Sequence, residues 1–243
     1  MPAHVRASAE LLRHSGRYVF VSSVSVYADF ATGPREESPT AELGDAPADE
    51  LAADYSNYGA LKALCEVEAR RVFGERALVV RPGLIVGPHD PTGRFTYWAR
   101  RLARGGEVLA PGPPERRVQF VDVRDLAAWI LDALERALGG VFNATNEGVT
   151  WRELLAGADV TWVTDEFLRE HEVGEWMELP LWLGDTAWAG MHATDVSRAL
   201  GAGLRFRPLA ETLAEASTAP AVEGVGLTPA REAELLAAWR AQA

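Results

Sequence analysis

The stretch RYVFVSSVSVY, residues 17–27, decides the fold prediction. Its first five residues are mostly β-branched or aromatic, which predicts a buried β-strand. Three serines follow directly, at Ser22, Ser23 and Ser25. Open α/β sheets bind their ligands beyond the carboxyl ends of their strands, so these hydroxyl groups lie where such a sheet would place a site. Serines after a strand are also common as plain loop residues.

A tyrosine and a lysine four residues apart indicate proton chemistry further along the chain. Lys62 is the only lysine, and it follows Tyr58 in the sequence YGALK. On a helix the two side chains share one face, so the ammonium is expected to favour the phenolate over an unperturbed pKa of about 10. Tyr58 would then serve as an acid or base near neutrality. The same spacing also occurs on many amphipathic helices as a half-exposed pair without chemistry.

Other segments predict an alternation of helices and strands. Residues 1–14 have an apolar side typical of a helix, and residues 76–81 and 141–145 predict two further strands. Residues 29–54 are polar and contain prolines that prevent regular structure, so we expect a surface loop with solvated acidic side chains. Asp122 is placed to cap the helix that follows it.

Together these segments resemble the extended short-chain dehydrogenase/reductases, the NAD(P)-dependent epimerases and dehydratases of sugar nucleotides and their reductase relatives. The segments that carry the resemblance are residues 19–27, 58–66, 78–88, 118–130 and 195–208. The resemblance implies an α/β fold with an incomplete Rossmann-like parallel sheet, in which only the later strands are present. A smaller C-terminal α/β substrate lobe would complete it.

The resemblance also implies a division of the chain. Residues 1–145 would form a truncated NAD(P)-binding Rossmann-like domain, with residues 91–116 contributing to the substrate lobe. Residues 146–243 would form the substrate-binding lobe. The cofactor would be NAD or NADP, and the residue that selects between them is not in this chain.

Site roles follow from the resemblance. Ser23 would hold the substrate oxygen, Tyr58 would exchange the proton, and Lys62 would lower the tyrosine pKa and hold the nicotinamide ribose. Besides Tyr58 and Lys62, the residues expected to contact the cofactor are Ser22, Pro82, Gly83, Leu84 and Ile85. The residues expected to contact the substrate are Ser25, Arg117 and Asn143, with Arg117 the candidate for a phosphate.

The glycine-rich turn that opens this family has no counterpart here. Relatives place the cofactor pyrophosphate at a helix that follows such a turn, whereas this sequence contains no G-x-x-G-x-x-G spacing. The adenine side of the cofactor site is therefore expected to be absent, and the strand at residues 17–21 to form an exposed apolar edge. A start codon assigned too far downstream, a truncated gene or a fragment would each account for this.

Two functions stay open at this point. The first is an NAD(P)-dependent epimerase, dehydratase or reductase that acts on a sugar nucleotide or a related carbonyl or alcohol substrate. The second is a non-catalytic truncated remnant that serves as a binding or regulatory scaffold.

The amino-acid composition limits the classes of partner and the cellular location that we expect. The formal net charge is −11 and no basic stripe is present, which argues against nucleic acid. No apolar run approaches the roughly 20 residues of a membrane span.

Cys65 is the single cysteine, so a disulfide within the chain is impossible and a cytoplasmic location is expected. His171 and His192 lack the spacing of a metal site. The expected partner is a small-molecule substrate, and analogy with relatives allows a homodimer.

Overall fold

The structure is a computed structural model that describes residues 1–184 and 186–242. It divides the chain into two compact units. Unit 1 comprises Met1–Leu84, Gln119–Glu147 and Ala189–Phe206, and unit 2 comprises Ile85–Val118, Gly148–Trp188 and Arg207–Ala243. Both units are therefore built from separate stretches of sequence, and the stretch Ala189–Phe206 groups with unit 1 although the sequence placed it in the second lobe.

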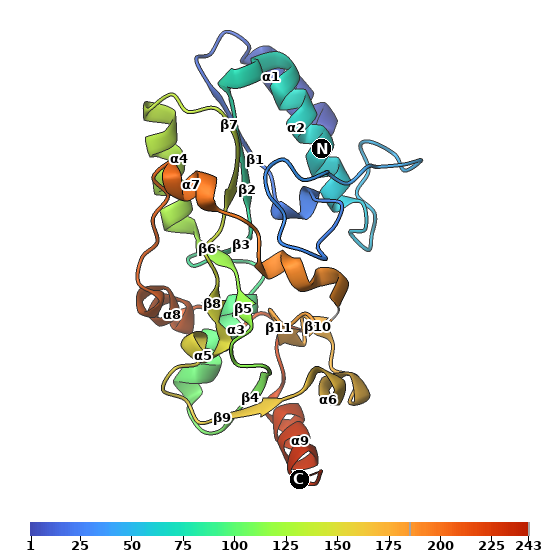
Figure 1. The fold of residues 1–243 in the computed structure, drawn as a ribbon, viewed down its shortest axis with the longest axis vertical. Helices are drawn as coiled ribbons and strands as arrows, with labels where there is room; N and C mark the ends of the chain where they lie inside the picture. Colours follow the sequence, from blue (N-terminus) through green and yellow to red (C-terminus); the bar gives the residue numbers. More distant parts are fainter. Residues whose placement is uncertain (185, 243) are drawn as a thin grey trace. The chain divides into compact units, whose positions relative to one another are not determined.

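A three-stranded parallel sheet forms the centre of unit 1, with the strand order β1-β2-β7. The strands are β1 (Tyr18–Val21), β2 (Ala77–Pro82) and β7 (Gly140–Ala144). Helices α1 (Pro2–Leu11) and α2 (Tyr58–Phe73) lie on one side of this sheet, and α4 (Val123–Glu135) and α7 (Ser197–Gly201) lie on the other (Figure 1). The predicted α/β class and partial Rossmann-like sheet are confirmed.

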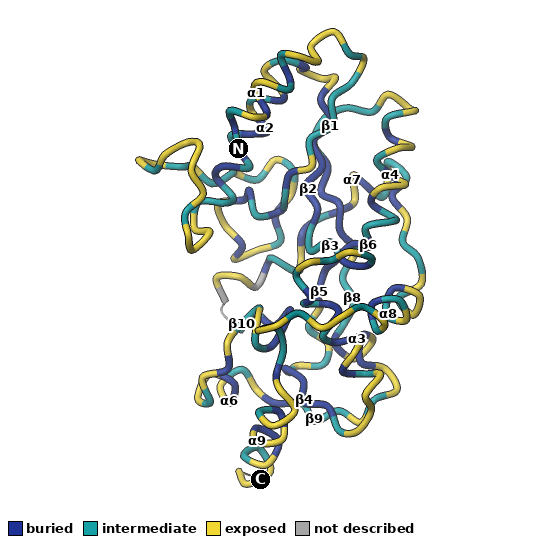
Figure 2. The backbone as a smooth tube through the Cα atoms, turned by 180° about the vertical axis from the view of Figure 1, so that it is seen from behind, coloured by how far each residue is buried: buried dark blue, intermediate teal, exposed yellow. Residues whose placement is uncertain are grey.

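The strands differ in burial according to their place in the sheet. All six residues of the central strand β2 are buried, whereas β1 lies at the edge and is only partly covered (Figure 2). Val21, the last residue of β1, is 42% exposed. The predicted apolar edge at this strand is therefore confirmed.

Small side chains let α1 and α2 pack closely. Val5 and Ala9 on α1 are buried, as are Cys65 and Ala69 on α2, and Val5, Cys65 and Ala69 belong to one apolar cluster. The ring of Tyr18 stacks on Phe73 with 4.9 Å between the ring centroids. Cys65 thus acts as a small core residue, which is the usual role of a buried free thiol.

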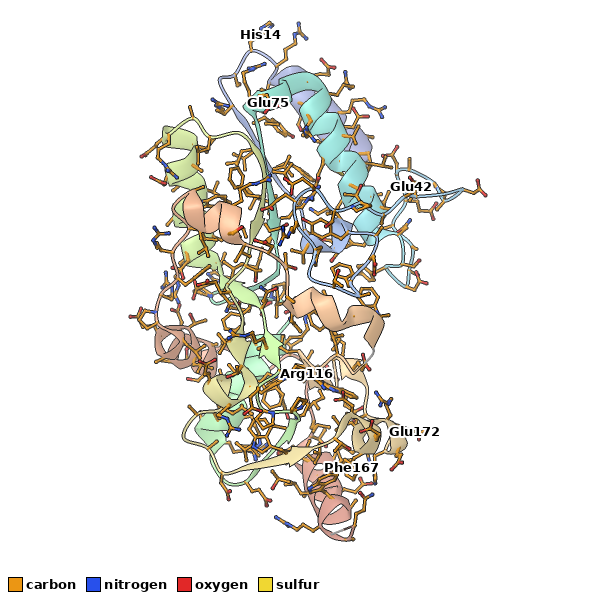
Figure 3. All side chains as sticks on the ribbon, in the orientation of Figure 1. His14, Glu42, Glu75, Arg116, Phe167 and Glu172 are labelled. Atoms are coloured by element: carbon orange, nitrogen blue, oxygen red, sulfur yellow. The ribbon has the colours of Figure 1, made fainter. Side chains whose placement is uncertain are left out.

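A short 3-10 helix, η1 (Val24–Val26), and a long irregular segment follow β1. The irregular segment runs to the start of α2 and contains a single isolated bridge, between Tyr27 and Thr40. Glu42 in this segment is exposed and points outward (Figure 3). The prediction of solvated acidic side chains is confirmed for Glu42 and wrong for Glu36, whose side chain is 5% exposed and accepts from the Asn143 backbone N–H at 3.0 Å.

Unit 2 is a mixture of short strands and helices around buried aromatic side chains. Trp98 and Trp151 are fully buried, and their rings meet edge to face with 4.9 Å between centroids. Strand β4 pairs with β9 in parallel, and β5 pairs with β8 antiparallel. The elements are α3 (Arg94–Arg104), β4 (Val108–Pro111), β5 (Arg117–Val118), β8 (Val149–Thr150), α5 (Trp151–Leu154), β9 (Val160–Val163), α6 (Asp165–Glu170), β10 (Glu175–Trp176), β11 (Leu179–Pro180), α8 (Leu209–Thr218) and α9 (Pro229–Arg240).

A buried ion pair anchors the terminal helix of unit 2. Arg101 on α3 and Glu232 on α9 have side chains only 4% and 3% exposed, and Arg101 Nε donates to Glu232 Oε1 at 2.8 Å. Glu232 also accepts from the Leu109 backbone N–H, which joins α9 to β4. Because each charge has partners, both side chains can stay inside the unit.

Four further elements complete the chain. They are η2 (Gly74–Arg76), β3 (Leu84–Val86), β6 (Phe120–Asp122) and η3 (Thr186–His192). Asp122 ends β6 and caps α4, because its side chain accepts from the Arg124 backbone N–H. The predicted cap is confirmed.

Replacing Asp122 with alanine should lower the free energy of unfolding by about 1 to 2 kcal/mol, because the amino end of α4 loses its side-chain acceptor. Urea unfolding of the full chain measures the change. Glu135→Ala, at the exposed last residue of α4, is the control and should stay within about 0.5 kcal/mol of the parent. Equal losses in both variants would contradict the role of the cap.

Candidate active site

Small or polar residues follow all three strands of the unit 1 sheet. Ser22 follows β1, Gly83 follows β2 and Thr145 follows β7. Because the strands are parallel, these positions share one edge of the sheet. A Cβ added at Gly83 would lie 2.7 Å from Thr145 Oγ1. That hydroxyl is buried and has no hydrogen-bond partner within the described part of the chain.

Two side chains of helix α2, one turn apart, form hydrogen bonds with the end of β1. Lys62 Nζ donates to the carbonyl oxygen of Val21 at 2.8 Å. Glu66, four residues later on the same helix face, accepts from Ser22 Oγ at 2.5 Å. Two successive residues of the strand end are therefore held by two successive turns of the helix.

The hydroxyl groups of Tyr58 and Ser23 lie close together at the same end of β1. A hydrogen bond joins Ser23 to Tyr58, the first residue of α2. Ser23 Oγ also donates to Ser25 Oγ at 3.0 Å and accepts from the Ser25 backbone N–H at 3.1 Å. The structure thus brings together the three predicted catalytic residues, Ser23, Tyr58 and Lys62, at the carboxyl end of β1.

Gly59 is a part of the site that the sequence did not reveal. A Cβ added there would lie 2.0 Å from the carbonyl oxygen of Ser25, which is far inside contact distance. Only glycine lets the first turn of α2 approach residues 22–25, the serine segment, so closely. The signal in the sequence is a glycine in the first turn of a helix, where it is otherwise unfavourable, but the sequence alone does not show what it touches.

Burial dominates the electrostatics of the pair. Burial raises the pKa of Tyr58, and the hydrogen bond with Ser23 offsets this only in part. Burial lowers the pKa of Lys62, and the nearby Cys65 and Glu66 offset this in part. Burial therefore sets the direction of the pKa shift on the phenol. That Lys62 lowers the pKa of Tyr58 stays a prediction.

Lys62 keeps capacity for a ligand. An ammonium has three N–H donors, and within the described residues only the Val21 carbonyl accepts from it. The ammonium also lies over the Phe20 ring, 4.9 Å from its centroid, and its side chain is only partly exposed. Two donors of the ammonium therefore remain without an acceptor in the described part of the chain.

The predicted substrate contacts are not all placed alike. Ser25 is partly exposed beside Ser23. Asn143 is fully buried on β7, where its Oδ1 accepts from the Tyr27 hydroxyl at 2.6 Å and its Nδ2 donates to the Asp195 carbonyl at 2.9 Å. Both ends of the amide are thus engaged inside unit 1. A contact of Asn143 with substrate stays a prediction.

The remaining predicted contacts lie in both units. Pro82 closes β2, and Gly83 and Leu84 follow it in unit 1. Ile85 belongs to unit 2, as does Arg117, which is exposed and donates to the Gly148 carbonyl. Their roles toward cofactor and substrate stay predictions.

Two other expectations concern the described residues as a whole. Within residues 1–184 and 186–242, no group of three or more His, Cys, Asp or Glu side chains is arranged to hold a metal ion. The helices of the same residues include none with both the length and the apolar character of a membrane span.

The phenol of Tyr58 should ionise above its ordinary pKa of 10.0, because burial disfavours the phenolate. The measurement is an ultraviolet titration of phenolate absorbance, in which the curve of Tyr58→Phe is subtracted from that of the parent. The difference should be a single step above pH 10.0. A step below that pH would show that the Lys62 charge outweighs burial.

Comparisons with known proteins show the family and the fold of the chain. A family model described as the NAD dependent epimerase/dehydratase family matches residues 3–145. No curated protein matches the sequence.

Solved structures share the fold at low identity. UDP-glucuronic acid 4-epimerase from Bacillus cereus, in complex with NAD, has a TM-score of 0.52 and 16% identity, and the match covers 87% of this chain and 64% of that one. The enzyme WbmH of Bordetella bronchiseptica, in complex with NAD+, has a TM-score of 0.56 and 20% identity, and the match covers 87% of this chain and 65% of that one. A dTDP-4-dehydrorhamnose reductase from Clostridium acetobutylicum has a TM-score of 0.57 and 17% identity, and the match covers 87% of this chain and 68% of that one. The matched part is thus about two thirds of the length of each.

Proposed function

Because the chain belongs to the NAD dependent epimerase/dehydratase family, we propose that it is an NAD(P)-dependent oxidoreductase acting on a sugar nucleotide or a related carbonyl or alcohol compound. The observation that carries the proposal is the meeting of Tyr58, Ser23 and Lys62 at the carboxyl end of β1. A phenol that is hydrogen-bonded to a hydroxyl, with a partly free ammonium one turn away, is suited to proton exchange with a substrate oxygen.

Each residue has a distinct task in this proposal. A bound nicotinamide ring supplies the acceptor or donor of hydride. Tyr58 gives a proton to the substrate oxygen in the reducing direction and takes it in the oxidising direction. The phenol is protonated at neutral pH, so Tyr58 carries the proton that the reducing direction requires. Ser23 holds the same oxygen, and the two free donors of Lys62 hold ribose hydroxyl groups.

The residues present suit one half of the cofactor. The free donors of Lys62 suit the hydroxyl groups of a ribose. The Thr145 hydroxyl, which is packed against Gly83 and has no partner in the described residues, is a second polar group at the same strand ends. Ser22 and Pro82 lie at the same strand ends. The sequence has no glycine-rich pyrophosphate turn, so the proposal assigns these residues to the nicotinamide half alone. NAD and NADP differ only in the other half.

Ligand-dependent thermal unfolding of the full chain tests the cofactor site. Nicotinamide mononucleotide at millimolar concentration should raise the melting temperature as much as NAD or NADP does, because the contacts lie on the nicotinamide side. ADP, which carries only the other half, is the control and should have no effect. A ligand at about 100 times its Kd would add about 2.7 kcal/mol of stability. If none of the nicotinamide compounds shifts the transition, the cofactor proposal fails and the scaffold alternative takes its place.

Turnover tests the role of Tyr58. Two trial reactions serve as assays, taken from the compounds named for enzymes of similar fold. Epimerisation of UDP-glucuronic acid in the presence of NAD is followed by separating the sugar nucleotides, because it leaves no net reduced nicotinamide. Reduction of dTDP-4-dehydrorhamnose is followed by the loss of NADPH absorbance. Tyr58→Phe should lower kcat by about 100- to 10,000-fold, the usual contribution of general acid–base catalysis. Tyr55→Phe removes a hydroxyl three residues earlier from a side chain that is 66% exposed, and should keep the parent rate. Equal rates in Tyr58→Phe and the parent would refute the assignment.

A further inference from the structure

A second ion pair, fully inside unit 1, joins the core to the candidate site. Arg81, near the end of β2, donates to both carboxylate oxygens of Glu66, from Nε at 2.9 Å and from Nη2 at 2.6 Å. The two side chains are 5% and 6% exposed. Such a two-point pair fixes orientation as well as distance.

The pair reaches both parts of the site. Glu66 Oε1 also accepts from Ser22 Oγ at 2.5 Å, and Ser22 is the neighbour of Ser23 in the chain. On the other side Glu66 follows Lys62 by one helical turn, and its carboxylate helps to keep the Lys62 ammonium charged by raising its pKa. One carboxylate therefore links the serine segment and the lysine-bearing face of α2 to the central strand.

The guanidinium of Arg81 has further bonds that hold it in place. Its Nη1 donates to the Tyr27 hydroxyl at 3.0 Å and to the Glu36 carbonyl at 3.1 Å. It also lies over the Tyr27 ring, 4.9 Å from the centroid. Arg81 is thus fixed from the strand side, and Glu66 has little freedom to turn.

A contribution to the stability of the fold does not by itself explain why Arg81 and Glu66 form a buried ion pair. Burying two charges costs desolvation that their attraction often only offsets, and apolar residues of similar volume are often as stable. What an apolar pair could not do is hold Ser22 by a hydrogen bond at a fixed place against α2. We propose that Arg81 and Glu66 are positioning residues that fix α2 against the end of β1, and so set the placement of Tyr58 and Lys62 relative to Ser23. The proposal rests on the proposed function.

The chain offers a matched control in unit 2. Arg101 and Glu232 form a pair of the same two residue types, with similar burial and a 2.8 Å bond. The other described bonds of this pair go to unit 2 groups, namely Arg104, Gly105, Glu107 and Leu109. The same double substitution can therefore be made at both pairs, Arg81→Met with Glu66→Leu, and Arg101→Met with Glu232→Leu.

Two measurements separate a positioning role from a structural one. Because Lys62 is the only lysine, isotope-labelled lysine gives one side-chain NMR signal, which reports the surroundings of its ammonium without any turnover. The Arg81/Glu66 double variant should move this signal toward that of free lysine and lower kcat by about 10- to 100-fold, the loss expected from a small misplacement. Its KM should change less than its kcat. The Arg101/Glu232 double variant should leave signal and kcat unchanged, whatever it does to the melting temperature.

A folded Arg81/Glu66 double variant with the parent lysine signal would overturn the proposal. If that variant does not fold, Ser22→Ala removes only the hydrogen bond to Glu66 and should move the lysine signal in the same direction, and an unmoved signal there would equally overturn it. A moved signal in a protein without turnover would support the positioning of Lys62 while the proposed function itself fails, so the two failures remain distinct.

Discussion

Helix α2 lies directly on the backbone of the serine segment, and the rest of the site depends on this contact. Gly59 permits it, because a Cβ at that position would lie 2.0 Å from the Ser25 carbonyl oxygen. The opposing atoms belong to the backbone, so no change of rotamer could make room. The depth at which α2 sits, and with it the position of Tyr58 at the first turn, is therefore set by the absence of a side chain.

The same closeness explains the electrostatics. Once α2 lies against the strand end, Tyr58 and Lys62 lose water, and burial favours the neutral form of both groups. For the phenol, burial is the largest cause of the shift, and the ammonium donates to the Val21 carbonyl. The raised pKa of Tyr58 keeps the proton on the phenol near neutral pH.

Local pattern predicted the elements, and distant contacts decided what they do. The β-branched run before Ser22, the capping position of Asp122 and the helix from Tyr58 to Lys62 all follow from neighbours in sequence, and the structure has them. The acceptor of Lys62 is a backbone carbonyl 41 residues away, which leaves no mark in the sequence. The two groups that bond to the Asn143 amide, the Tyr27 hydroxyl and the Asp195 carbonyl, are likewise far away along the chain.

Arg81 is a charged residue in the otherwise apolar strand β2, and its place in the sequence predicts only part of its role. A charge in an otherwise apolar strand requires a buried partner, but the strand does not say where the partner lies. The parallel order of the sheet places α2, which connects β1 to β2, across the strands, and Glu66 comes from that helix. In unit 2 the same chemistry, Arg101 with Glu232, ties a terminal helix to its neighbours. The two pairs differ in what stands beside them, so their roles follow from their places in the fold and not from the residues that form them.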